Sequence, residues 1–449
     1  MKKVINAMLA ATLVSAIGIP VVAQAQSNSS AIAESMVSPV SDTPSDTQAA
    51  TFNLYSVETC FSLAQDILRN YYENIELGTA LSAKRSFVDT KSLDASLSNY
   101  LQNKITTKQF VVDAANAQKE NYTLKFNLLS SEVTKEGILL TISTEASFNY
   151  VGLDVQSGFG EVSNILFKNT DAGLIVTDLQ MPYDYYDEYV RGQEDHSRDL
   201  ASIYSKSNNA SITERQAELH SRITQYFSVD RELPVQMNSI DGEKTTNRSI
   251  TPYATLTALN KTSIATYAKN NKAKTSPSSG GSSVPYYDFS QLTGNWDCTN
   301  FVSHALLAGG AVPYDTNGSG IASTGWYYRS LSNRASSWSG VPNLYSFLVN
   351  NTTKGPAGTS TTYSTFRYNS NTGYPYAVGD ILQFYLSGSY NNWRHSTIIT
   401  EYYETTTDFV FGALVTGRSG QGTYNDNQKA EEIYPGDSKR VIKLTGYYK

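Results

Sequence analysis

The spacing of apolar residues changes near residue 120, and this limits the first half of the chain to two kinds of element in a set order. Before the change, apolar residues recur every three or four positions, the period of one helix face: Cys60, Leu63, Ala64, Ile67, Leu68 and Tyr71. A weaker helical pattern covers residues 91–117. After it, apolar and polar residues alternate, as in a half-buried strand: Tyr122, Leu124, Phe126, Leu128, Ile138, Leu140 and Ile142. Helices followed by an antiparallel sheet predict an α+β domain at residues 51–185.

The order of these elements resembles that of the nuclear-transport-factor-2-like group of folds. The resemblance rests on element order alone and implies a cone-shaped α+β fold without implying any chemistry. Residues 186–250 are polar, with helical patterns at 184–193 and 213–227. They predict a helical linker region that joins this domain to the remainder of the chain.

The first 25 residues have the three parts of a secretory signal peptide. Lys2 and Lys3 are basic, residues 7–19 are apolar, and Ala23-Gln24-Ala25 offers the small residues that signal peptidase accepts. An uncleaved N-terminal anchor is the alternative, but no basic flank follows the apolar run. Residues 26–50 lack periodicity and predict a disordered leader. No later stretch approaches the ~18 apolar residues of a membrane helix, so we expect no integral span in the mature form.

The charge balance of the mature chain excludes some classes of partner. Lys2 and Lys3 are the only Lys or Arg residues before residue 26, so 33 basic residues face 41 acidic ones and the formal charge is about −8. Nucleic acids and polyanionic polymers attract basic surfaces. We therefore expect no nucleic-acid partner.

Only two cysteines occur, Cys60 and Cys298. A secreted scaffold held by disulfides would carry more for this length. Two interpretations stay open: a single disulfide between the two, which would indicate an inert or binding module, or two thiols with separate roles. Cys60 lies on the apolar stripe of a predicted helix, where core packing explains it, so the second interpretation is favoured.

The segment GNWDCTNFVSHALLAGG, Gly294–Gly310, carries the strongest chemical signal. Asp297 is a good N-cap, and Cys298 would then occupy the first turn of a helix that Gly309 and Gly310 terminate. A thiol at a helix N-terminus feels the positive end of the macrodipole, which favours the nucleophilic thiolate. Backbone amides there also serve an oxyanion hole. A buried cysteine that merely packs is the alternative, but its polar neighbours argue against burial.

His395 is the best candidate for the base among four histidines. His196 and His220 lie among charges in the polar linker. His304 is six residues beyond Cys298, about 240° around a regular helix, and cannot face the same cleft. His395 opens the strand-like run HSTIITEYY. A helix-borne Cys facing a His on an antiparallel strand is the arrangement of papain-like thiol hydrolases.

The C-terminal ~200 residues resemble the putative amidase domain family of bacterial secreted proteins, a distant relative of papain-like and NlpC-type enzymes. The resemblance covers roughly residues 250–449 and rests on these segments: LNKTSIATYAKNN, WDCTNFVSHALLAGG, GWYYRSL, SSWSGVPNLYSFL, GDILQF, WRHSTIIT and the tail from VTGR to YYK. It implies a papain-like cysteine hydrolase domain at residues 251–449, in which a helix carrying Cys298 packs on an antiparallel sheet. It also implies hydrolysis of an amide by Cys298 and His395.

A third residue that orients the imidazole is expected after the histidine strand. The chain departs from the family pattern there, because residues 416–419 read TGRS where such domains often show a His-Thr pair. Asn425 and Asp426 are candidates on chemistry alone. No His-x-x-x-His or Cys-x-x-Cys ligand pattern appears, so we expect no metal and no cofactor.

These features together predict a secreted, cysteine-dependent amidase or peptidase from a bacterium, and we expect a Gram-positive one. Peptidoglycan peptides are the most accessible amides outside such a cell, so they are the expected substrate. Two alternatives stay open: a peptidase that acts on γ-glutamyl or protein substrates, and a catalytically inactive secreted binding module.

Overall fold

The computed structural model describes residues 55–76, 92–171, 173–182, 184–191, 210–228, 255–273, 297–387, 391–405, 409–420 and 423–449. All of them belong to one compact unit, Phe52–Lys449. The predicted signal peptide and leader, residues 1–50, lie outside the described residues, as does His196.

Two long helices open the described chain, as the helical stripe predicts. Helix α2 (Val57–Glu76) buries Cys60, Ala64, Ile67, Leu68 and Tyr71. Helix α4 (Ala95–Ala114) begins at Asp94, whose carboxylate accepts a hydrogen bond from the backbone N–H of Ser96 at 2.9 Å. This bond satisfies one of the donors that a helix N-terminus leaves free.

The alternating segment forms four antiparallel strands, which confirms the α+β prediction for this part. They are β1 (Lys119–Val133), β2 (Ile138–Tyr150), β3 (Gln156–Thr170) and β4 (Gly173–Gln180). The apolar side chains of the strands pack against α2, α4, α5 (Tyr185–Arg191) and α7 (Ala210–Ser228) in one core. The likeness to the nuclear-transport-factor-2-like group stays a prediction.

The remaining chain adds four helices and most of the strands. The helices are α8 (Lys261–Asn271), α9 (Cys298–Ala308), α10 (Ser336–Ser339) and α11 (Val341–Asn350). The strands are β5 (Leu256–Thr257), β6 (Ile321–Ala322), β7 (Tyr328–Ser330), β8 (Asn333–Ala335), β9 (Gly355–Thr362), β10 (Phe366–Arg367), β11 (Ile381–Leu386), β12 (Asn392–Glu404), β13 (Val410–Gly420), β14 (Thr423–Lys429) and β15 (Lys439–Tyr448).

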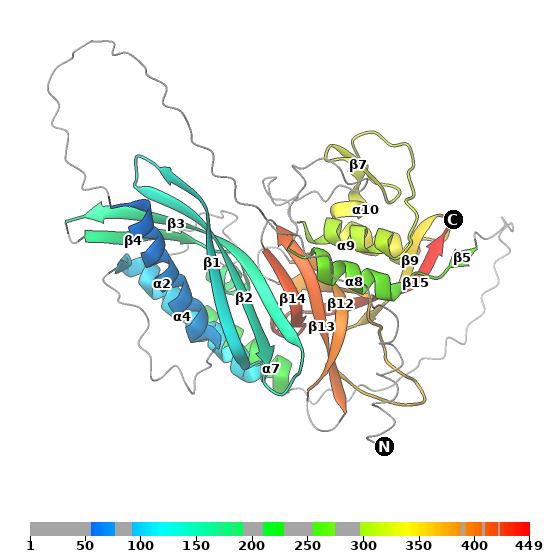
Figure 1. Ribbon diagram of the computed structural model, residues 1–449. Coiled ribbons are helices and arrows are strands. Elements are labelled where there is room, and N and C mark those ends of the chain that lie inside the picture. The colour runs from blue at the N-terminus through cyan, green and yellow to red at the C-terminus, as the bar shows by residue number, and fades with distance from the viewer. Residues whose placement is uncertain are drawn as a thin grey trace, which may run out of the picture. The chain divides into compact units, whose positions relative to one another are not determined.

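A single 12-stranded sheet runs through both parts of this unit. Its order is β1-β2-β3-β14-β13-β12-β11-β15-β5, with β4 beside β3, β10 beside β13 and β9 beside β15. Figure 1 shows β14 as the strand that meets β3. The junction consists of three residue pairs, Tyr424 with Gly160, Asn425 with Phe159 and Asp426 with Gly158. Strands β6, β7 and β8 form a separate small sheet.

Helices α8 and α9 lie side by side on one face of β12 and β13 (Figure 1). Apolar residues of α8, α9 and α11 form a core with Ile381, Ile398 and Ile442 of the sheet. The opposite face carries its own core around Phe384, Ile399 and Val415. Cys298, the first residue of α9, lies where this layer of helices meets strand β12. None of the described helices is long and apolar enough to cross a membrane.

Candidate active site

The thiol of Cys298 meets strand β12 at its main chain. Its Sγ lies 3.8 Å from the carbonyl oxygen of Arg394 and 3.8 Å from the hydroxyl of Thr299. The backbone N–H groups of Ser396 and Thr299 also point at the sulfur, where they favour its ionised form. Arg394 and Ser396 are the two neighbours of His395, so the fold brings the predicted nucleophile to the backbone that carries the predicted base.

The N-cap predicted at Asp297 is wrong in its mechanism, although α9 does begin at the next residue. The Asp297 side chain makes no capping hydrogen bond. Its carboxylate instead lies 2.6 Å from Nη2 of Arg418 and accepts a 2.7 Å hydrogen bond from the amide of Asn300. Both charged side chains are almost fully buried, and a buried cation requires a paired anion more strongly than a helix end requires a cap.

The expectation of an exposed, acidic thiol is also wrong. Cys298 is only 1 % exposed. Burial raises the pKa of Cys298 to about 11, and the nearby negative charge of Asp297 adds to the rise. The hydrogen bonds to the sulfur act in the opposite direction but do not outweigh desolvation. The polar neighbours that argued against burial, Thr299 and Asn300, are themselves buried and engaged in hydrogen bonds.

The side chain of His395 is buried on the opposite face of β12 from that of its neighbour Ser396. Its ring packs 5.6 Å from Phe384 and 6.1 Å from Tyr434, measured between ring centres. Burial lowers the pKa of His395 to about 4, although its hydrogen bond to Asn425 opposes this. At neutral pH the resting site therefore holds an uncharged thiol and an uncharged imidazole.

Of the two candidates for a third residue, Asn425 contacts the imidazole. Nε2 of His395 lies 3.3 Å from Oδ1 of Asn425. The Asn425 amide group donates from Nδ2 to Oε1 of Gln428 at 2.6 Å, which turns its oxygen toward His395. Nε2 then carries the proton, and Nδ1 keeps its lone pair. Nδ1 is buried, and no described residue makes a hydrogen bond to it.

Gly417 lets His395 reach Asn425 across an intervening strand. Strand β13 lies between β12 and β14, and Gly417 pairs directly with Asn425. A Cβ atom at Gly417 would lie 2.7 Å from Cγ2 of Thr397, which is two residues from His395 and shares its face. A larger residue at this position would therefore collide with Thr397 and disturb the strand beside His395.

Asp426 does not contact the imidazole. Strand alternation turns its side chain to the opposite face from Asn425. There it pairs with Lys272, the residue that follows α8, with 2.7 Å between Oδ2 and Nζ. The two residues that chemistry alone could not separate thus have different surroundings.

Tyr434 contacts one member of the predicted pair, and its pKa responds to the charge of the other. Its ring packs against His395. Burial raises the pKa of Tyr434, and the negative charge that Cys298 gains on ionisation adds to the rise. No described residue, Cys298 included, makes a hydrogen bond to Nδ1 of His395.

A chain of polar side chains that sequence reasoning missed continues from the thiol across the sheet. Thr299 lies 3.3 Å from the hydroxyl of Ser396, and Gln383 donates to that same hydroxyl at 3.1 Å. Gln383 in turn accepts two hydrogen bonds from Arg440, at 2.9 and 2.7 Å. A lone polar residue inside the apolar strand ILQFYL was the available signal for Gln383.

The disulfide alternative is excluded, because Cys60 and Cys298 are both free thiols. Cys60 is fully buried in the core of α2, as its apolar stripe predicts. His304 is buried on α9 with its ring edge against Trp338, 5.4 Å away, and belongs to the packing of the helix. Among the described residues, no three His, Cys, Asp or Glu side chains gather as ligands for a metal ion.

Comparison with known proteins identifies a domain family in the C-terminal part of the chain. No curated protein gives a significant match to the chain. No solved structure gives one either. Residues 258–444, which include Cys298, His395 and Asn425, match the model of the putative amidase domain family.

Proposed function

We propose that the chain is a secreted hydrolase that cleaves amide bonds with Cys298 as nucleophile, His395 as base and Asn425 as the residue that positions the imidazole. The family match indicates an amidase-type function. The observation that carries the proposal is the hydrogen bond from His395 to Asn425. It leaves Nδ1 without a hydrogen-bond partner among the described residues, so that its lone pair can accept a proton.

The reaction starts from an uncharged pair, because burial opposes both ionised forms. The sulfur of Cys298 attacks the amide carbonyl while its proton passes to Nδ1 of His395. Backbone N–H groups in the first turn of α9 stabilise the oxyanion. His395 then gives the proton to the leaving amine, and a thioester on Cys298 remains.

Water completes the cycle by the same path. His395 takes a proton from water as the oxygen attacks the thioester carbonyl. The acid leaves, and the proton returns to the sulfur of Cys298. Asn425 holds the imidazole in the tautomer that both steps need, since its oxygen accepts the Nε2–H.

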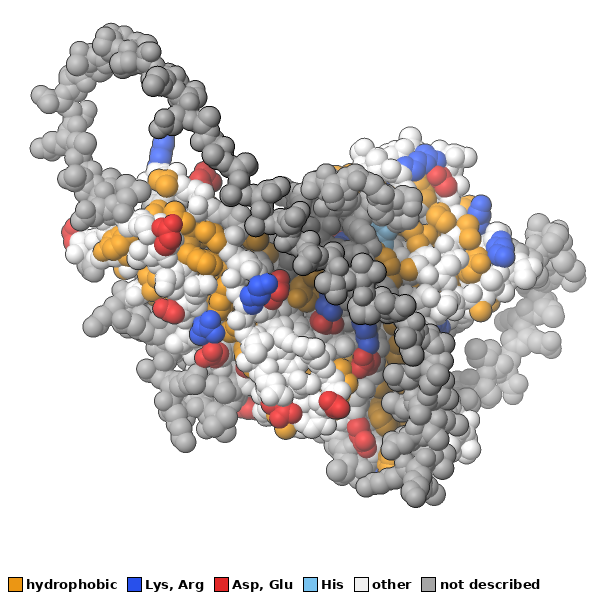
Figure 2. Space-filling view, viewed as in Figure 1, with side chains coloured by type: hydrophobic (Ala, Val, Ile, Leu, Met, Phe, Trp, Pro, Cys, Tyr) orange, Lys and Arg blue, Asp and Glu red, His pale blue; other side chains and the backbone are white. Residues whose placement is uncertain are grey.

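Peptidoglycan peptides are the substrate that we propose for this site. The basic and apolar parts of residues 1–25 support export, and exported amidases of bacteria meet these peptides first. On the face in Figure 2, Lys and Arg side chains are interspersed with Asp and Glu side chains, so this face offers no strong positive field to a polyanion. A peptidase for γ-glutamyl or protein substrates is the second candidate, favoured by the same site.

Digestion of purified sacculi followed by mass spectrometry tests the substrate. The wild-type protein should release fragments with a newly cut stem- or bridge-peptide amide, and Cys298→Ala should release none. Identical digests from the two proteins would exclude peptidoglycan. Cleavage of γ-glutamyl or protein substrates by the wild type alone would then retain the cysteine mechanism with another substrate.

A further inference from the structure

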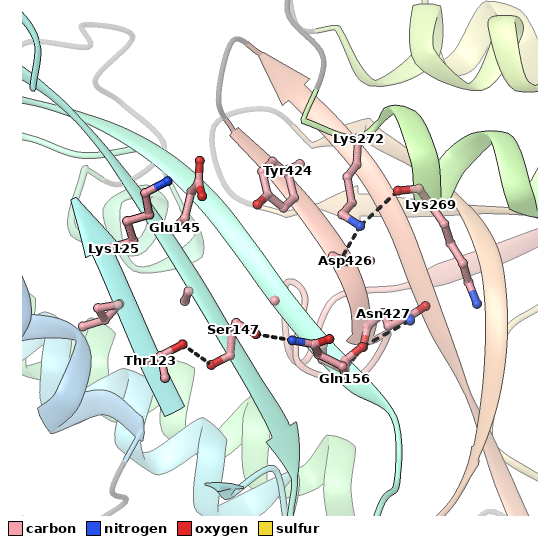
Figure 3. A pocket seen from close by; sticks show the side chains of 14 residues that line it. Thr123, Lys125, Glu145, Ser147, Gln156, Lys269, Lys272, Tyr424, Asp426 and Asn427 are labelled. Atoms are coloured by element: carbon pink, nitrogen blue, oxygen red, sulfur yellow. Dashed lines mark hydrogen bonds and ion pairs between the residues drawn. The ribbon is translucent and has the colours of Figure 1, made fainter. Parts of the chain in front are cut away.

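A polar groove lies on the far side of strand β14 from the imidazole. Its volume is about 580 Å³, within the range of about 300–1,000 Å³ that small-molecule sites occupy. Residues of β1, β2, β3 and β14 line it, together with Lys269 of α8 and Lys272 at the end of that helix (Figure 3). The proposed reaction uses none of its side chains.

Glycines give the groove its floor. Residues paired across neighbouring strands share one face of a sheet. Two such rows cross β1, β2, β3 and β14 here: Thr123, Ser147, Gly158 and Asp426 in one, and Lys125, Glu145, Gly160 and Tyr424 in the other. In each row the residue of β3 is a glycine, which has no side chain. A trough one strand wide therefore separates the polar groups of β2 from those of β14.

The backbone of the sheet requires a glycine at one position of the trough. A Cβ atom at Gly158 would lie 2.5 Å from the backbone carbonyl oxygen of Ala146, which no side chain tolerates. Figure 3 shows Lys125 and Glu145 on one side of the gap and Tyr424 and Lys272 on the other. A ligand that lies along the trough would therefore meet side chains from both directions.

The charges in the groove are balanced. Lys272 pairs with Asp426 at 2.7 Å, and Lys269 pairs with Glu401. Lys125 stands directly opposite Glu145 in the strand register. Because each cation has an acidic neighbour, the groove offers no strong field of one sign to an ionic ligand.

The groove instead offers donors and acceptors in alternation beside one aromatic ring. Gln156 donates to the hydroxyl of Ser147 at 2.7 Å, and carboxylates that are paired once keep further acceptor positions. Tyr424 is half-buried and adds an apolar surface with a polar tip. Hydroxyl groups both donate and accept, so they match such a lining better than ions do. We propose that this groove binds a neutral carbohydrate chain.

This inference goes beyond the proposed function and does not depend on it. Tyr424 and Asp426 alternate with Asn425 along β14, so the groove and the imidazole-positioning residue occupy opposite faces of one strand. A carbohydrate in the groove would lie beside the strand that serves the active site.

Isothermal titration calorimetry on the full-length mature Cys298→Ala protein tests the inference, since this variant cannot turn over a substrate. The probes are neutral pentasaccharides of β-1,4-linked N-acetylglucosamine, glucose and mannose, with pentaglycine as the peptide comparison. We expect saturable binding of at least one sugar. Tyr424→Ala should weaken it at least about tenfold, a loss of about 1.4 kcal/mol, while Tyr424→Phe should retain it.

Tyr368→Ala is the matched control, because Tyr368 is an exposed tyrosine outside the groove. It should bind sugar as tightly as the parent. If Tyr424→Ala does not fold, Gln156→Ala replaces it as the groove variant. Gln156 is exposed, and its substitution by alanine removes one hydrogen-bond donor from the groove.

Three results would overturn the inference: no saturable binding of any sugar at about 10 mM, equal binding by the parent and the groove variant, or tighter binding of pentaglycine than of sugar. Hydrolysis assays on the wild type keep the two proposals apart. Sugar binding without amide hydrolysis would contradict the proposed function alone, and hydrolysis without sugar binding would contradict this inference alone.

Discussion

Asn425 and Asp426 follow each other in β14, yet the first contacts the imidazole and the second pairs with the lysine that follows α8. Chemistry alone allowed either to orient His395. Only the register of three strands separates them, and that register depends on contacts between residues about 30 positions apart. The sequence therefore predicted the pair of candidates but not the choice between them.

Removal of the Asn425 oxygen should slow the reaction without weakening substrate binding. In Asn425→Ala the imidazole loses the acceptor that fixes its tautomer. We expect kcat to fall by about 10- to 100-fold with KM unchanged, as for other residues that position a catalytic group. Steady-state kinetics measures the split.

Asn164→Ala is the control for the loss of an amide oxygen. Asn164 accepts a side-chain hydrogen bond from Thr141 at 2.9 Å, on β3 and outside the site. Its kcat should match that of the wild type. A rise in KM alone for Asn425→Ala, or an equal fall in kcat for both variants, would argue against the positioning role.

The raised pKa of Cys298 predicts how the alkylation rate of the thiol depends on pH. Alkylating agents react with the thiolate, and burial raises the pKa of this thiol to about 11. Below that pH, the thiolate fraction rises tenfold for each pH unit. The alkylation rate of Cys298 in a Cys60→Ser background should therefore increase about tenfold per unit from pH 6 to pH 9, without levelling.

The same titration in urea is the control, and there the rate should level near the ordinary pKa of a free cysteine, about 8.5. A plateau at pH 5–7 in the folded protein would show a thiolate–imidazolium pair. That result would contradict the uncharged resting site.

The start of helix α9 shows where element-level prediction succeeds and where it fails. The block around Cys298 predicted a helix that begins at that residue and ends before Gly309, and both limits are confirmed. The cap assigned to Asp297 is wrong, because its partner Arg418 lies more than 100 residues later in the sequence. Local propensity finds helix limits, but a long-range ion pair decides what a side chain does there.

Loss of one partner of the Asp297–Arg418 pair should lower the free energy of unfolding strongly. Arg418→Met would leave a buried carboxylate without its cation, which costs about 3–5 kcal/mol. The double variant Asp297→Asn/Arg418→Met removes both charges and should recover part of this loss. Urea denaturation measures the free energy of unfolding of each variant.

The exposed pair Asp315–Arg329 is the matched control, with side chains 37 % and 36 % exposed. Arg329→Met should cost less than about 1 kcal/mol, because water screens this pair. Equal losses at the two sites would show that burial does not set the importance of the pair at α9.

At the scale of the whole molecule, the two parts share one sheet through β3 and β14. Alternation and helical patterns in the sequence predicted the strands β1, β2 and β12 and the helices α2, α4 and α9 well. Residues 256–257, shortly before α8, form a short strand that pairs with β15. Sheet continuity was not predictable, because pairing of β3 with β14 joins residues more than 260 positions apart.

The shared sheet predicts that residues 251–449 are less stable alone. Loss of β3 exposes the edge of β14, which favours self-association. It also removes Lys119, the partner of Glu432 at 3.1 Å, and the carbonyl of Asn116 that accepts from Lys429. We expect a lower urea midpoint than for the mature chain, together with concentration-dependent association in sedimentation experiments. A monomeric fragment with an unchanged midpoint would show that the predicted boundary at residue 251 separates two independent domains.

A matched pair of cysteine variants tests the central claim most directly. Cys60 and Cys298 are both buried free thiols, but only Cys298 lies beside the imidazole strand. On the amide substrate that the wild type cleaves fastest, Cys298→Ala should lower the rate of hydrolysis at least about a thousandfold. Cys60→Ala should leave the rate per folded molecule close to that of the wild type. Undiminished hydrolysis by Cys298→Ala would contradict the assignment of Cys298 as the nucleophile.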